Sequence, residues 1–347
     1  MLIDRISLFF PTIAMRSIMY KTYIICLWLI FCFLPLASQA DNIWITPEKM
    51  LSSTSGKMLF ASERESSLSL FSKDFGTDKS TLIVKAAVAG RGEYEPSVSP
   101  DGKQIAFTTY RYGGWKIAVS DIDGNNIRRL TMDPQYAYDP HWSADGKKIV
   151  YRRIVNNGGA YFRGQADIFE INIDGTGNRN LSKTNNAGDR KPAYSPNGKK
   201  IVYDSFAGKE QEELWLMIMD ADGKNLHRIN SDVASDAMFA PSWSPDGEWV
   251  AHLRADTQNY IDVWIMRPNG AEAKNLTRSK ERGLPPSNKL IRHWQFDTNW
   301  TKDGEVIAFV GNYLDQKNID IYAVGFSGEN LARLTKHSAI DLHPYWY

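Results

Sequence analysis

Charged and imidazole side chains recur in the segments that lead into five copies of a fourteen-residue motif and into a shortened sixth copy at the carboxyl end. These residues are Glu93, Glu95, Asp139, Asp189, Lys191, Asp236, Arg292, His293, Asp297, Asp341 and His343. Mixed charges that converge on one hollow can bind a peptide, a glycan or a cation. The simpler interpretation is that polar side chains solvate a channel and cap strand ends.

Two of the six histidines raise the question of a metal site. His293 and His343 lead into the fifth and sixth copies of the motif, with acids close by, which suits zinc or manganese. No compact H-x-x-x-H spacing supports this assignment, and histidines with hydrogen-bond partners are the alternative. The sequence therefore predicts no cofactor, with a divalent cation at His293 and His343 as the competing hypothesis.

The elements that must position these residues are short strands. The motif reads YDPHWSADGKKIVY at residues 138–151, and equivalent prolines recur roughly every fifty residues, a period typical of propeller blades. Asp-Gly or Asn-Gly dipeptides between the strands predict tight hairpin turns, because glycine accepts a positive φ without steric cost. Each copy begins an antiparallel unit of four strands, and its Trp or Tyr is expected to pack between adjacent sheets. These residues are Trp142, Tyr194, Trp243, Trp300 and Trp346.

The two ends of the chain complete one another. Residues 342–347 supply a sixth inner strand, and residues 55–84 supply three strands without an inner strand of their own. We therefore predict an all-β, six-bladed β-propeller that is closed by pairing of the N- and C-terminal segments, which removes open sheet edges. A seventh blade is the alternative if residues 279–296 contain degenerate strands.

The pattern P-x-W-S-P-D-G-K-x-I-A-F, followed by D-I-Y-x-M-D-x-D-G and R-R-L-T, resembles the repeat of the TolB-type propellers, the PD40 or WD40-like family. The resemblance covers residues 55–347 and is far more specific for fold than for function. TolB itself carries a separate α/β domain before the blades. Here residues 41–54 form only a short N-terminal extension, which puts identity with TolB, and the interactions of that domain, in doubt.

In a four-stranded meander, the loops that join the second strand to the third lie at the same rim as the connectors between repeats, and we call this rim the loop face. The tight turns lie at the opposite rim, which we call the turn face. Function concentrates on loops held by a rigid scaffold, so we expect the ligand at the loop face and the channel mouth. Aromatic and Arg side chains in these loops are typical of protein interfaces and could equally stack on sugar rings. The predicted ligand-binding residues are Glu95, Asp139, Lys191, Arg163, Arg292, His293, Trp294, Asp297, Asp341 and His343.

The first forty residues differ from the rest. An apolar run at residues 23–36 follows Arg16 and Lys21 and precedes Ser38-Gln39-Ala40, the pattern of a secretory signal cut after Ala40. A membrane-anchoring N-terminal helix is the alternative, although the run is short for a span. Both cysteines, Cys26 and Cys32, lie in this segment, so the exported chain has neither disulfides nor thiolate chemistry.

These features predict an exported, periplasmic or secreted propeller that binds a protein partner in the cell envelope without catalysis. A formal net charge of +1 gives no reason to expect nucleic acid, and no stable membrane span is expected after signal cleavage. No G-x-S-x-G elbow follows the repeats, so a propeller-containing serine peptidase is not expected. The alternative is a metal-assisted carbohydrate-active enzyme, similar to the propeller lyases that cleave oligogalacturonate, with a glycan as ligand.

Overall fold

The computed structural model describes residues 43–51, 56–156, 165–184, 187–207, 213–229, 237–287 and 295–347. The chain divides into two units, Met1–Asp41 and Asn42–Tyr347. The first unit, which contains the predicted signal peptide, lies outside the described residues. Within the described part of the second unit, the named helical elements are the short helix α2 (Pro47–Met50) and the 3₁₀ turn η2 (Glu63–Glu65).

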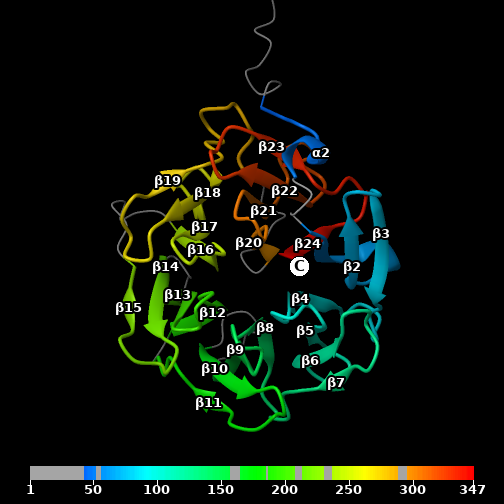
Figure 1. Cartoon of the computed structure of the whole chain (residues 1–347), viewed down its shortest axis with the longest axis vertical. Helices are drawn as coiled ribbons and strands as arrows, with labels where there is room; N and C mark the ends of the chain where they lie inside the picture. The colour runs from blue at the N-terminus through cyan, green and yellow to red at the C-terminus, as the bar shows by residue number, and fades with distance from the viewer. Residues whose placement is uncertain are drawn as a thin grey trace, which may run out of the picture. The chain divides into compact units, whose positions relative to one another are not determined.

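The second unit is a β-propeller, built from antiparallel sheets that follow one another around a central channel (Figure 1). One sheet contains β4 (Glu93–Val98), β5 (Gln104–Thr109), β6 (Lys116–Asp121) and β7 (Arg128–Arg129). The next contains β8 (Ala137–Trp142), β9 (Lys148–Asn156), β10 (Gln165–Asn172), β11 (Arg179–Asn180), β12 (Ala187–Tyr194), β13 (Lys200–Ala207), β14 (Glu213–Asp220) and β15 (His227–Arg228). A third contains β16 (Ala237–Trp243), β17 (Val250–Ala255), β18 (Ile261–Met266) and β19 (Lys274–Asn275). A fourth contains β20 (Thr298–Trp300), β21 (Val306–Gly311), β22 (Asp320–Gly325) and β23 (Leu331–Arg333). The last contains β24 (Asp341–Trp346), β1 (Met58–Ser62), β2 (Ser69–Asp74) and β3 (Lys79–Val84).

The sheets do not confirm six separate four-stranded blades. Four sheets have four strands each, but β8–β15 form one eight-stranded sheet, in which β10 pairs in parallel with β12 through Ala166 and Gly188. A Cβ added at Gly188 would lie 2.0 Å from Cζ of Phe206, so only glycine leaves room for this close approach. Strands β8–β11 and strands β12–β15 are therefore joined into one sheet at Gly188, a residue without a side chain.

The pairing of the two chain ends is confirmed. Strand β24 pairs antiparallel with β1, and Tyr347 exchanges two backbone hydrogen bonds with Lys57, of 2.9 and 3.1 Å. The Tyr347 hydroxyl also lies 2.7 Å from Oγ of Ser72 on β2. These contacts close the ring with one sheet that draws on both ends of the sequence (Figure 1).

The first strands of the repeats, β4, β8, β12, β16, β20 and β24, lie nearest the channel (Figure 1). Their aromatic residues link neighbouring sheets, as the sequence predicts. Trp142 Nε1 donates to the carbonyl of Ser97 at 3.0 Å, and Trp243 Nε1 donates to that of Ala193 at 3.1 Å. Trp300 repeats this contact on the next pair of sheets. The indole N–H groups of these three tryptophans are thereby paired.

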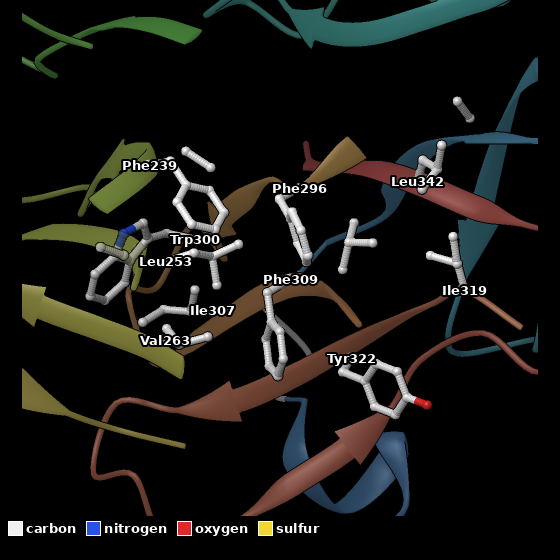
Figure 2. Close-up of a cluster of buried hydrophobic side chains, with 14 of the residues drawn as sticks. Phe239, Leu253, Val263, Phe296, Trp300, Ile307, Phe309, Ile319, Tyr322 and Leu342 are labelled. Carbon is white, nitrogen blue, oxygen red and sulfur yellow. The ribbon is translucent and has the colours of Figure 1, made fainter. Parts of the chain in front are cut away.

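Hydrophobic side chains fill the space between adjacent sheets. Figure 2 shows Phe239 and Leu253 facing Trp300, Ile307 and other residues of the following sheet. The rings of Phe239 and Phe296 are 5.3 Å apart, and both side chains are buried. Burial of such a side chain contributes about 1.5–3 kcal/mol, so these interfaces hold the inner strands, and the residues they carry, in place.

Candidate functional site

Five of the six inner strands share one irregularity, an extra residue directly before the proline. In β4, Tyr94 pairs with Thr108 and Ser97 with Ala106, so three residues of β4 span the length of two on β5. This is a β-bulge, and equivalent register shifts occur in β8, β12, β16 and β24. The bulge residue has a left-handed φ of 52–54° in all five strands, in Glu95, Asp139, Lys191, Ala240 and His343.

Such a φ is uncommon for residues other than glycine, and strained backbone of this kind clusters at functional sites. Four of the bulge residues, Glu95, Asp139, Lys191 and His343, face the central channel, together with Asp297, which leads into β20. These residues line a small cavity of about 80 Å³ at the channel mouth. The bulge therefore directs these side chains, rather than their neighbours, into the channel.

A lysine lies at the centre of the ring of charges. Lys191 Nζ is 2.8 Å from Oδ1 of Asp297, 3.6 Å from Oδ1 of Asp139 and 3.9 Å from Oε1 of Glu95. His343 Nδ1 contacts the second oxygen of the Asp297 carboxylate. Five residues from five sequence repeats thus meet in one network, as the sequence predicts.

The network shifts the proton affinities of its members. Burial, with the charge of Asp139, raises the pKa of Glu95 well above its ordinary value. Burial opposes ionisation of Asp139 as well, but Lys191 and Arg152 outweigh it and lower the pKa of Asp139 to about 2. Burial also disfavours the ammonium of Lys191, yet the surrounding carboxylates raise its pKa above the usual range.

The imidazole of His343 behaves differently. Burial lowers the pKa of His343, and the positive charge of Lys191 acts in the same direction, against the attraction of Asp297. The ring therefore places three acidic side chains, of Glu95, Asp139 and Asp297, around the single ammonium of Lys191. Acidic groups outnumber basic ones in it.

Two ring acids also have a structural role. Glu95 Oε2 accepts the backbone N–H of Asp139 at 2.8 Å, and Asp139 Oδ2 accepts that of Lys191 at 3.3 Å. Each acid thus satisfies the backbone of the bulge in the following repeat, which a buried N–H needs. This agrees with the simpler interpretation of these residues, since they cap neighbouring strands as well as lining the channel.

The prediction that Asp341 joins the channel mouth is wrong. Asp341 is fully buried beside β1, and its Oδ2 accepts from Nη2 of Arg64 at 2.8 Å. Residues two apart share a face of a regular strand, but the bulge after Leu342 breaks that relation between Asp341 and His343. The carboxylate therefore pairs with Arg64 of the turn η2 instead of facing the channel.

Four other predicted ligand-binding residues, Arg163, Arg292, His293 and Trp294, lie outside the described residues. The metal hypothesis needs His293, so it stays untested. Among the residues that the structure describes, no group of three or more His, Cys, Asp or Glu side chains is arranged to hold a metal ion. Lys191 is a cation that already occupies the centre of the carboxylates.

A second layer of the channel was missed from the sequence. His141, Asn299 and Tyr345 lie two residues beyond the bulge positions and line the same cavity. The rings of His141 and Tyr345 are 6.3 Å apart. Strand alternation is the signal that could have identified them, because side chains two residues apart share a face once the bulge is passed.

The loop face carries exposed apolar side chains that the sequence analysis did not select. In the described part of the chain, five large hydrophobic side chains are exposed, and four of them lie on loops or strand ends of this face. These are Val88, Met132, Val155 and Leu314. Met132 is 67% exposed and Leu314 52%, far above the buried residues around them.

A family model described as the TolB beta propeller domain (PD40) matches residues 45–237, more than half of the chain. The chain belongs to the TolB β-propeller family. No described helix of this family member is both long and apolar enough to cross a membrane.

Curated relatives match this TolB-family chain over part of their length. An uncharacterized protein of Agrobacterium fabrum is 30% identical over 163 residues, which are 45% of this chain and 53% of the relative. The Tol-Pal system protein TolB of Anaeromyxobacter dehalogenans is 28% identical over 131 residues, 38% of this chain and 27% of the relative. The chain thus spans about half or less of the length of these relatives.

Solved structures show the same fold. TolB from Acinetobacter baumannii superposes with a TM-score of 0.67 at 15% identity, over 86% of this chain and 68% of that one. An oligogalacturonate lyase in complex with manganese gives a TM-score of 0.55 at 15% identity, over 82% and 74% of the two chains. At this level of identity the likeness supports the TolB-type propeller as architecture, without carrying a function.

Proposed function

We propose that this protein is an exported, non-catalytic binding module of the periplasm or cell envelope that holds a protein partner at its loop face and channel mouth. The observation that carries the proposal is the distribution of exposed apolar side chains. Four of the five in the described chain share one face with the charged ring. Apolar side chains exposed beside polar groups on one face are a feature of protein interaction sites.

The charged ring supports the same proposal. Its members are already paired with one another, as Lys191 is with Asp297 and Asp139, which suits a preformed recognition surface. A relative whose name places it in the Tol-Pal system is consistent with an envelope role. The excess of carboxylates favours a partner that brings a basic group to the channel mouth.

Site-specific photo-crosslinking in intact cells tests the proposal. A photoreactive residue placed at Met132 or Leu314 should give a discrete adduct with one protein. Lys199, an exposed residue of a tight turn on the turn face, provides the matched control and should give none. Equal labelling from Lys199, or no adduct from either loop-face position, would contradict the proposal.

A second experiment addresses the polar centre. Once the adduct identifies a partner, Asp297→Asn should weaken its binding because the substitution removes one carboxylate from the ring. Asp246→Asn, on an exposed turn of the opposite face, is the control and should leave binding unchanged. A partner that binds both variants equally would exclude the channel mouth from the interface.

Two finer features belong to the proposal. We propose that residues 1–40 are a cleaved signal, so that the exported protein starts at Asp41, which N-terminal sequencing tests. We also propose that the eight-stranded sheet acts as two blades, giving six. The strand orders β8-β9-β10-β11 and β12-β13-β14-β15 support this, since each repeats the order of the other sheets. Hydrogen exchange should then show separate protection of the two halves.

The metal-assisted carbohydrate-active enzyme stays the alternative, favoured by the fold that the chain shares with an oligogalacturonate lyase. The described donor set does not suit a cation, because Lys191 Nζ already lies among the carboxylates. Elemental analysis of the purified protein distinguishes the two. Stoichiometric metal, lost together with activity on a polysaccharide upon chelation, would favour the enzyme.

A further inference from the structure

The turn face carries a second cavity at the opposite end of the channel. Its volume is about 320 Å³, at the lower end of the range of small-molecule sites. It adjoins the charged ring only through residues of the second layer, among them His141, Ser242 and Asn299, which line both cavities. Glu95, Asp139 and the other charged members of the ring do not reach it.

The floor of this cavity is polar but uncharged. Burial lowers the pKa of His141 to about 4, so its ring is neutral at physiological pH. Its Nδ1 lies 2.9 Å from the carbonyl of Trp142 and 3.3 Å from the backbone nitrogen of Tyr194. No hydrogen bond among the described residues uses Nε2, which leaves this atom for a ligand.

Two further floor residues have hydrogen-bonding capacity left. Asn299 Oδ1 accepts the backbone N–H of Trp346 at 2.8 Å, so the amide nitrogen remains as a donor. The other residue is Ser242. The hydroxyl of Thr298 donates its proton to a carbonyl, so the Ser242 hydroxyl, 2.8 Å away, must donate to Thr298 Oγ1. The lone pairs of Ser242 Oγ therefore remain as acceptors. The floor thus offers both donors and acceptors to an uncharged ligand.

The rim of the cavity is apolar and rigid. It includes four exposed side chains, one from each of four repeats, namely Pro100, Ala144, Pro196 and Pro245. Each lies against the turn glycine of the following repeat: a Cβ added to those glycines would meet the four side chains at 3.5–3.7 Å. Indole rings such as Trp243 and Trp300 continue the wall inward. Among the described residues that line the cavity, Lys302 is the only lysine, arginine or acid.

We propose that the turn-face cavity binds an uncharged, hydroxylated ring the size of a mono- or disaccharide. The apolar faces of a sugar pack on proline and indole rings, while its hydroxyl groups both donate and accept hydrogen bonds. A single phenol or aliphatic side chain would use at most one floor group, and a charged ligand would find no matching set of charges. The rigid rim also lowers the ordering cost of binding.

Calorimetry and intrinsic fluorescence of the exported protein test this site, with maltose, cellobiose and chitobiose as probes. We expect saturable binding of at least one disaccharide and a change in tryptophan emission, because Trp243 and Trp300 line the cavity. Binding should be insensitive to added salt, since the ligand is uncharged. His141→Phe, which removes the free ring nitrogen, should weaken binding at least tenfold.

A matched pair of variants locates the site. Ala144→Trp fills the opening and should abolish binding, whereas Lys147→Trp adds the same bulk to the same turn outside the cavity and should not. Both positions are exposed, so neither should alter the thermal unfolding midpoint. No binding of any probe at millimolar concentration, or binding that survives Ala144→Trp, would overturn the proposal. Crosslinking at the loop face would be unaffected by either result, so the two proposals fail independently.

Discussion

Replacement of Lys191 by methionine is the most direct test of the charged ring. The Lys191 ammonium is 2.8 Å from Asp297 and 3.6 Å from Asp139, and its side chain is only 9% exposed. Two opposite charges 2.8 Å apart attract each other by about 6 kcal/mol at an effective dielectric constant of 20. Desolvation offsets much of this attraction, and removal of one partner of a buried pair typically costs about 3–5 kcal/mol.

We therefore expect Lys191→Met to lower the free energy of unfolding by about 4 kcal/mol at pH 8. The loss should shrink at pH 5, because carboxylates without a counter-charge have a raised pKa in the folded state. Such groups contribute stability that is present below their unfolded pKa and lost as pH rises through the folded pKa. Urea denaturation at the two pH values measures both effects.

Lys200→Met is the control. Lys200 pairs with Asp220 at 2.9 Å, but its side chain is 44% exposed, so its loss should cost less than about 1 kcal/mol and vary little with pH. If Lys191→Met matched Lys200→Met in both size and pH dependence, the ring would not be the electrostatic unit described above. A larger loss at pH 5 than at pH 8 would refute the assigned charges.

Three further predictions test other parts of the fold. Burial raises the pKa of Glu93 to about 7, so the wild type should lose up to about 3 kcal/mol of stability as pH rises from 4.5 through 7, and Glu93→Gln should abolish that slope in urea titrations. Gly188→Val should cost about 3 kcal/mol in thermal unfolding through its clash with Phe206, and Phe206→Ala should recover part of the loss in a double-mutant cycle. Deletion of Tyr347 removes three hydrogen bonds and should cost about 3 kcal/mol in urea unfolding, against about 1 for Tyr347→Phe, which loses only the hydroxyl contact.

Much of the architecture could be predicted because local chemistry dictates it. The Asp-Gly turns fix the register of each hairpin, and Gly102 and Gly146 adopt the positive φ that these turns require. The repeated outline also identifies which residues meet at the channel, so Glu95 and Lys191 were placed correctly although 96 positions separate them. Because equivalent positions of the repeats lie together around the channel, the repeat pattern predicts contacts between residues that are far apart in the sequence.

The remaining features depend on tertiary details without a local signal. One extra residue in five of the inner strands decides which side chain faces the channel, and for this reason the prediction for Asp341 is wrong and His141 is not among the predicted residues. The joining of β10 to β12 depends on the absence of a side chain at Gly188. The exposed fraction of the Met132 side chain depends on how the surrounding loops pack. The amino-acid composition does not predict this packing.

The left-handed residue before the proline has a consequence for how this protein could diversify. Glutamate, aspartate, lysine, alanine and histidine all adopt the same φ there, within 2°. The backbone conformation at these positions is therefore compatible with several residue types. A single codon change at one of them would alter what the channel recognises, and it would also remove contacts of the original side chain, such as the hydrogen bond that Glu95 accepts from the following bulge.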